Sequence, residues 1–126
     1  MTTASARNAI GAAGEQLAAE HLTAEGWVIL ARNWRCATGD LRGELDVIAR
    51  DGDTLVFCEV KARRGRGAGD PVEAVTPRKL AQVRALAAAF MQETLLRPPD
   101  ARIDVIGVCW PPGGGPAELT HLRAVG

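Results

Sequence analysis

The sequence predicts an α/β protein with a mixed sheet and the element order α-β-β-β-α-β-β. Two stretches have the periodicity of amphipathic helices, and they alternate with shorter stretches of strand-like composition. With 126 residues, 47% of them hydrophobic, the chain is long enough for one core, and neither an internal repeat nor a change of composition marks a second domain. We therefore expect a single domain over residues 1–126.

The first helix is predicted over residues 7–25, where apolar residues recur at helical spacing: Ile10, Ala13, Leu17 and Leu22. Glu15 lies on the flank of this stripe, where a helix either presents a carboxylate to a site at the edge of the core or exposes it to solvent. A strand is predicted from Trp27 to Trp34, followed by a polar loop over residues 35–42. Its aromatic residues are interpreted as packing anchors, because aromatics make up only 4% of the chain.

Two further strands flank a turn signal at Gly52-Asp53, within the stretch from Gly43 to Arg64. A type II′ turn with glycine first would be a two-residue loop, and a four-residue loop would give the same register. A three-residue loop would instead send Asp46 to the other face of the sheet. The pairs expected from the first two loops are Asp51 with Thr54, Asp46 with Glu59, and Glu44 with Lys61.

These two strands carry charged side chains in segments that are otherwise apolar enough to be buried. Cβ atoms of directly opposed residues lie roughly 4.5–5.5 Å apart, so Asp46 and Glu59 would repel each other unless a proton or a cation lay between them. Carboxylate oxygens of this kind suit Mg²⁺ or Mn²⁺. The role of Glu44 stays open between a structural ion pair with Lys61 and a ligand of a second metal ion. Cys58, on the opposite face, is interpreted as a core thiol.

After Lys61 the sequence ARRGRGAGDPVEAV predicts a mobile surface loop, which either orders over a polyanion or only connects two elements. The second helix is predicted to begin with Thr76 as N-cap and Pro77 in the first helical position, and to end at Pro98-Pro99. Two strands follow, over residues 102–110 and 118–125, with a loop rich in proline and glycine between them.

The net charge is zero, so the molecule as a whole offers no general attraction to nucleic acid. Residues 61–84, however, hold seven basic and two acidic residues, a local net charge of +5. This patch is compatible with a phosphate backbone laid across a metal site, and equally with a solvated surface. Lys79 and Gln82 would contact phosphate if the second helix packs beside the hairpin.

Cysteine usage and hydropathy indicate the compartment. Cys36, Cys58 and Cys109 are odd in number and lack CxxC spacing, which favours reduced thiols over disulfides or a zinc site. No stretch approaches the length of a transmembrane helix, and the N-terminus lacks the apolar run of a signal peptide. We therefore expect a cytoplasmic protein with no membrane partner.

Asp46, followed after a short hairpin by Glu59-Val60-Lys61, resembles the PD-(D/E)xK nuclease signature, although Leu45 stands where the motif name has proline. The αβββαβ order resembles the restriction-endonuclease-like core of that superfamily. The chain is also similar to the YraN-like family of small bacterial predicted endonucleases and to archaeal Holliday junction resolvases. The matching features, which cover residues 8 to about 110, are Gly14-Glu15, Asn33, Gly43 to Ala49, Val56 to Lys61 with Arg63, Pro71, Glu73 to Val75, Lys79, and Arg102 with Asp104 to Ile106.

The resemblance implies a Mg²⁺- or Mn²⁺-dependent endonuclease that hydrolyses DNA by in-line attack of an activated water, with branched or structured DNA as a candidate substrate. Asp46, Glu59 and the Val60 carbonyl would bind the metal, and Glu15 would join them. Lys61 would position or help deprotonate the water and stabilise charge on the phosphate. The candidate DNA contacts are Arg63, Arg64, Arg66, Lys79 and Gln82. A homodimer is expected by the same resemblance.

Two other interpretations stay open. The chain could be a nucleic-acid-binding or scaffolding protein that keeps the nuclease fold without appreciable turnover, an alternative that the zero net charge and low aromatic content favour. The hairpin charges could also be purely structural, with Glu44, Glu59 and Lys61 forming a ladder of ion pairs.

Overall fold

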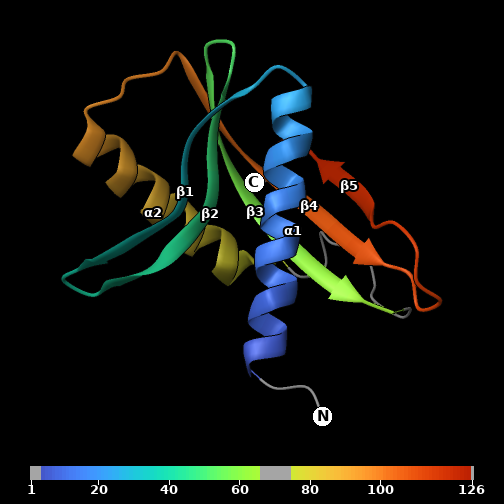
Figure 1. Ribbon diagram of the computed structural model, residues 1–126. Helices are drawn as coiled ribbons and strands as arrows, with labels where there is room; N and C mark the ends of the chain where they lie inside the picture. Colours follow the sequence, from blue (N-terminus) through green and yellow to red (C-terminus); the bar gives the residue numbers. More distant parts are fainter. Residues whose placement is uncertain (1–3, 66–74, 126) are drawn as a thin grey trace.

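The computed structural model describes residues 4–65 and 75–125. Within them the chain forms two helices and five strands in the predicted order, as Figure 1 shows. The elements are α1 (Ala4–Ala24), β1 (Val28–Thr38), β2 (Leu41–Asp51), β3 (Thr54–Arg64), α2 (Pro77–Thr94), β4 (Asp100–Trp110) and β5 (Glu118–Leu122). The predicted fold class, α/β with a mixed sheet and a C-terminal strand, is confirmed.

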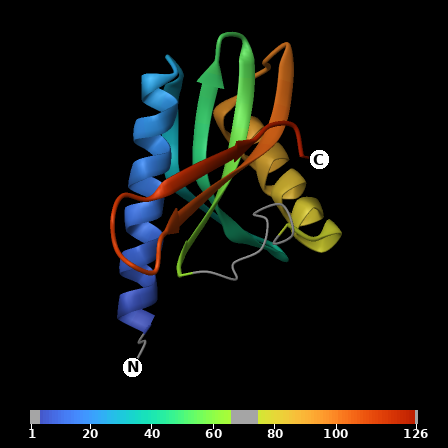
Figure 2. The ribbon, with the colours of Figure 1, turned by 90° about the vertical axis from the view of Figure 1, so that its right-hand side faces the viewer.

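The strands form one sheet in the order β1-β2-β3-β4-β5. The pair β3–β4 is parallel, and the other three neighbouring pairs are antiparallel. A parallel pair needs a crossover connection, and α2 lies within it. Figure 2 shows the two helices on opposite faces of the sheet.

Each face of the sheet has its own core. On the α1 face, alternate residues of β2, β3 and β4 pack against Ala18 and Leu22 of the helix, and Cys58 is among them, as predicted. On the α2 face, Phe57 and Phe90 meet edge to face, and Trp34 packs on Phe90 in the same way. The interpretation of the aromatic residues as packing anchors therefore holds on this face.

The hairpin between β2 and β3 has the predicted two-residue turn. Gly52 has φ of 60° and Asp53 is not among the positive-φ residues, which fits a type II′ turn, and Asp51 pairs with Thr54. The ladder ends, however, at the pair of Val47 with Cys58. Beyond that pair β2 and β3 diverge, as Figure 1 shows. The expected cross-strand pairs of Asp46 with Glu59 and of Glu44 with Lys61 are therefore not formed.

The loop predicted over residues 35–42 is wrong. β1 continues to Thr38, β2 begins at Leu41, and only Gly39 and Asp40 separate them. Most residues of this segment are polar because they face solvent, and this composition is typical of a loop. Only a few side chains, such as Cys36 and Leu41, pack partly against the α2 core. The two strands thus form a long arm beside α2 rather than a loop.

Other boundaries differ by a few residues. The second helix ends at Thr94, because Leu95 takes a left-handed conformation with φ of 60°, before the prolines that were predicted to end it. β3 continues to Arg64, so Arg63 and Arg64 belong to a strand. Residues 66–74 of the predicted mobile loop lie outside the described residues. Neither described helix combines the length and apolarity needed to cross a membrane.

The C-terminal strand is tied to the sheet by Asp104, which is fully buried. Its Oδ1 accepts hydrogen bonds from the Arg102 guanidinium and from the Ala124 backbone nitrogen, both at 3.0 Å. The Nε2 atom of His121 lies 2.8 Å from its Oδ2. Removal of one of these partners would leave the buried carboxylate less well paired, which is strongly destabilising.

Candidate metal centre

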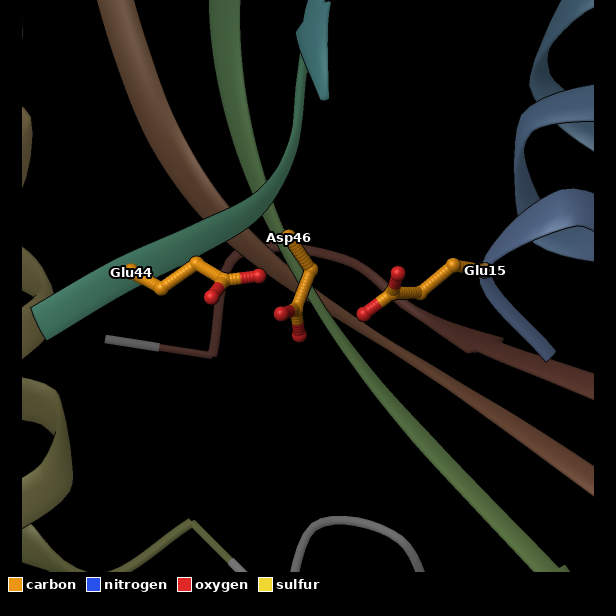
Figure 3. Close-up of side chains that lie close together, drawn as sticks. All are labelled: Glu15, Glu44 and Asp46. Carbon is orange, nitrogen blue, oxygen red and sulfur yellow. The ribbon is translucent and has the colours of Figure 1, made fainter. Parts of the chain in front are cut away.

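Three carboxylates meet where α1 passes the gap between β2 and β3. Glu15 comes from α1, and Glu44 and Asp46 come from β2. Figure 3 shows their side chains directed into one common space, where one oxygen of each lies within 4.8 Å of the others. In the described ranges 4–65 and 75–125, no other three His, Cys, Asp or Glu side chains form such a group.

Glu15 reaches the site because α1 packs very close to β3. A Cβ atom at Gly14 would come within 2.5 Å of the Ala62 Cβ atom, so only glycine permits this approach. The next residue, Glu15, is thereby held half-buried beside the end of the ladder. Glu15 therefore faces the other two acids rather than solvent alone, and the close contact at Gly14 brings it there.

β2 does not alternate regularly at Asp46, contrary to the prediction that Asp46 shares a face with Ile48. Leu45 and Ile48 both pack on the α2 side, whereas strict alternation would put them on opposite faces. Asn33 lies between the paired residues Arg32 and Trp34 of β1, just as Asp46 lies between their partners on β2, and its backbone is left-handed with φ of 53°. At this point the alternation of side chains between the two faces of the sheet is interrupted in both strands. As a result, the side chain of Glu44 lies on the α1 side.

The carboxylate of Asp46 is fixed by a backbone contact. Its Oδ2 accepts a hydrogen bond from the Val60 nitrogen at 2.9 Å. This nitrogen lies just beyond the last pair of the β2–β3 ladder, so the side chain satisfies a donor that a strand partner would otherwise satisfy. Asp46 is thus held in the gap between the two strands.

Glu59 approaches the gap from the α2 side. Its side chain is 12% exposed, and its Oε2 lies 3.5 Å from the Lys79 ammonium nitrogen. Its Oε1 is buried and has no hydrogen-bond partner among the described residues. A buried carboxylate oxygen without a partner is costly, so this atom is suited to a cation.

The pKa values of the acids are raised by their burial and by their closeness to one another. Burial, and then the negative charge of Asp46, raises the pKa of Glu59 to about 7, although Lys79 opposes the rise. Burial, and then the charges of Asp46 and Glu44, also raises the pKa of Glu15. Burial raises the pKa of Asp46, against the hydrogen bond from Val60. A bound cation would relieve this mutual repulsion.

These residues fit a divalent metal ion. Oxygens bound to one Mg²⁺ at about 2.1 Å lie roughly 3–4 Å apart, so carboxylates already within 4.8 Å need only small side-chain movements. A set made only of oxygen atoms suits Mg²⁺ or Mn²⁺ better than metals that prefer nitrogen or sulfur. The three grouped acids, Glu15, Glu44 and Asp46, could hold the ion. Glu59 and the Val60 carbonyl are not part of this group, and their role as further ligands stays a prediction.

The positive charge that acts on Asp46 and Glu59 comes from Lys79, which offsets part of the rise in the pKa of both. Lys61 lies on the same face of β3 as Glu59, but its side chain is exposed. Within the described part of the chain it has no ion-pair partner at 4.0 Å or less. The catalytic role of Lys61 stays a prediction, whereas the sequence had assigned Lys79 only to DNA contact.

Of the other predicted contacts, Gln82 donates a hydrogen bond to the Arg42 carbonyl at 2.9 Å and so ties α2 to β2. Arg63 and Arg64 lie at the end of β3, and Arg66 is outside the described residues. Glu44, whose role the sequence left open, belongs to the acid group and also pairs with Arg35 at 3.2 Å.

A groove of about 420 Å³ lies between the turn of the β1–β2 arm and the start of α2. Three basic residues line it, Arg42, Arg78 and Lys79, against one acidic residue, Asp40. Because Lys79 also contacts Glu59, the groove adjoins the acids. Arg42 was missed as a candidate contact because its segment was predicted to be a loop.

The fold and the acid group define an α/β protein with a candidate centre for a divalent metal. The chain belongs to the uncharacterised protein family UPF0102, whose model matches residues 14–108, and this confirms the YraN-like family predicted from the sequence. It is 62% identical over 91 residues to a UPF0102 protein of Acidothermus cellulolyticus, a match covering 72% of this chain and 66% of that protein. It is also 46% identical over 121 residues to a UPF0102 protein of Kineococcus radiotolerans, covering 95% of each.

Proposed function

We propose that this protein is a Mg²⁺- or Mn²⁺-dependent endonuclease that hydrolyses DNA phosphodiester bonds. The observation that carries the proposal is the convergence of Glu15, Glu44 and Asp46 within 4.8 Å. A buried oxygen of Glu59, which has no hydrogen-bond partner in the described part of the chain, supports it. The resemblance of Asp46 and Glu59-Val60-Lys61 to the PD-(D/E)xK signature supports the same reaction class. Branched or otherwise structured DNA is the substrate that the resemblance to resolvases favours.

A divalent ion at this site would stabilise charge on the scissile phosphate and make a water molecule more acidic. The residues of the chain have separate tasks around it. Asp46 is held by Val60 and gives the site a fixed oxygen, while Glu15 and Glu44 close the site from the α1 side. Lys61 and Lys79 lie toward the α2 side, where an ammonium group could stabilise charge on the phosphate.

The basic groove supplies a route for the rest of the substrate. Arg42, Arg78 and Lys79 line it, and it adjoins the acids through the contact of Lys79 with Glu59. A phosphate backbone in this groove would place a neighbouring phosphate near the metal ligands. Phosphate contacts of this kind position nucleic acid without reading its sequence.

The test is a cleavage screen with Mg²⁺ and with Mn²⁺ over linear, flapped and four-way-junction DNA. Asp46→Asn and Lys61→Ala should each abolish metal-dependent cleavage and leave the fold intact, as checked by circular dichroism. Cleavage retained in Asp46→Asn would show that the activity does not come from this site. If no DNA is cleaved but junction DNA is bound, the chain is instead a binding or scaffolding protein on a nuclease fold.

A further inference from the structure

Asn33 occupies an unusual place in β1. Its φ of 53° puts it in the left-handed region, which few residues other than glycine adopt, although asparagine tolerates it better than most. It falls between the paired residues Arg32 and Trp34, at the level where Asp46 falls between their partners on β2. The strain is therefore located in the strand residue beside the acids, where strained residues often mark functional sites.

The side-chain amide of Asn33 contacts two of the three clustered acids. In the orientation that satisfies its hydrogen bonds, the amide nitrogen donates to Glu15 Oε1 at 2.9 Å and to Glu44 Oε1 at 2.7 Å. One NH₂ group has two hydrogens, so each carboxylate receives one. Hydrogen bonds to charged acceptors are stronger than neutral ones, and these two join a helix residue to a strand residue.

We propose that Asn33 is a positioning residue that holds Glu15 and Glu44 beside Asp46. The left-handed backbone directs the amide between α1 and β2, and the amide spans the gap between two carboxylates that would otherwise repel each other. Residues that orient metal ligands in this way tune metal affinity without contacting the metal. This inference rests on the proposed function only for its metal-binding readout, because the contacts with the acids can be tested without metal.

The first experiment is a double-mutant cycle on thermal stability in EDTA at pH 8. Asn33→Gly removes the amide but tolerates the left-handed backbone, so its loss in Tm reports the amide, and Asn33→Ala reports the added backbone strain. We expect Asn33→Gly to lower the Tm in the wild-type background and to lower it less in Glu44→Ala or Glu15→Ala, because each of these removes one of the two acceptors of the amide. Additive Tm shifts in both backgrounds would overturn the inference.

The second experiment is a calorimetric titration with Mn²⁺. Asn33→Gly should weaken Mn²⁺ binding by about 10- to 100-fold, the usual effect of losing a residue that orients ligands. Unchanged affinity in this variant would also overturn the inference. If wild-type protein binds no Mn²⁺ while the stability cycle is non-additive, the proposed nuclease function fails and the positioning role of Asn33 stands.

Discussion

At the scale of single residues, the site is a set of acids placed closer together than their charges favour. Glu15, Asp46 and Glu59 all have raised pKa values, and in each case burial is the first cause. The contacts with Asn33, Val60 and Lys79 offset the repulsion only in part. Such an arrangement lowers stability in the absence of a cation and raises affinity for one.

Glu59→Gln should stabilise the metal-free protein. The pKa of Glu59 is about 7 in the folded protein, above its ordinary value of 4.5, so folding takes up a proton between these two pH values. The stability that comes from neutral Glu59 is therefore full below about pH 4.5 and is lost as the pH rises through 7. At pH 8 the substitution should raise the free energy of unfolding by on the order of 2–3 kcal/mol.

Urea unfolding in EDTA at pH 8 and at pH 4.5 measures this effect. The gain should vanish at the lower pH, and the exposed Glu118→Gln should have little effect at either. A loss of stability in Glu59→Gln at pH 8 would show that Lys79 already compensates the charge.

At the scale of elements, one glycine sets the distance between α1 and the sheet. A Cβ atom at position 14 would clash with Ala62, so Gly14→Ala should push α1 outward and carry Glu15 away from Asp46. We expect a loss of about 1–3 kcal/mol in unfolding free energy from overpacking, together with weaker Mn²⁺ binding. Chemical denaturation and calorimetry check the two effects.

Gly11→Ala is the matched control on the same helix. A Cβ atom there would meet nothing within 4 Å, so this change should stabilise the protein by about 0.5–1 kcal/mol, because alanine favours a helix. A stabilisation of similar size from both substitutions would mean that helix propensity, rather than the contact with Ala62, decides the effect at position 14.

The two hairpins show what local sequence could predict. A turn at Gly52-Asp53 was predicted because apolar strand patterns flank it, and the register of the two-residue loop holds from the pair of Asp51 with Thr54 to that of Val47 with Cys58. Gly39-Asp40 has the same residues and a φ of 59° at its glycine, but it was missed because its flanking strands are mostly exposed and polar. A strand is recognised in a sequence by the apolar residues that it buries. The β1–β2 arm buries few side chains and therefore lacks this pattern.

The position of Asp46 could be predicted only in part. Alternation predicted a cross-strand pair of Asp46 with Glu59, but the ladder ends one pair earlier, at Val47 and Cys58. The change of facing at Asn33 and the divergence of β2 from β3 depend on tertiary packing, because Leu45 is drawn to the α2 core. For this reason the grouping of Glu44 with Glu15 could not be derived from strand periodicity.

At the scale of the whole molecule, a net charge of zero hides an uneven distribution. Acids occupy the gap between β2 and β3, and basic residues line the neighbouring groove between the β1–β2 arm and α2. The fold joins residues from four elements there, which no local pattern in the sequence could show. DNA bound to this protein should follow the groove rather than the surface in general.

Arg78→Ala should therefore weaken DNA binding and reduce the slope of log affinity against log salt by about one unit, because one phosphate contact is lost. Arg50→Ala is the control, since Arg50 is exposed and lines a different pocket, near Leu30 and Pro98. Fluorescence anisotropy over a salt series measures both. Equal losses in the two variants would place the DNA elsewhere.

The central claim is that the acids in the gap form a divalent metal site, and calorimetric titration with Mn²⁺ tests it most directly. Wild-type protein and Glu118→Gln should bind Mn²⁺ with the same affinity, whereas Asp46→Asn should lose binding because it removes a charge from the centre of the group. Absence of binding to the wild type at millimolar Mn²⁺, or equal binding to Asp46→Asn, would contradict the account.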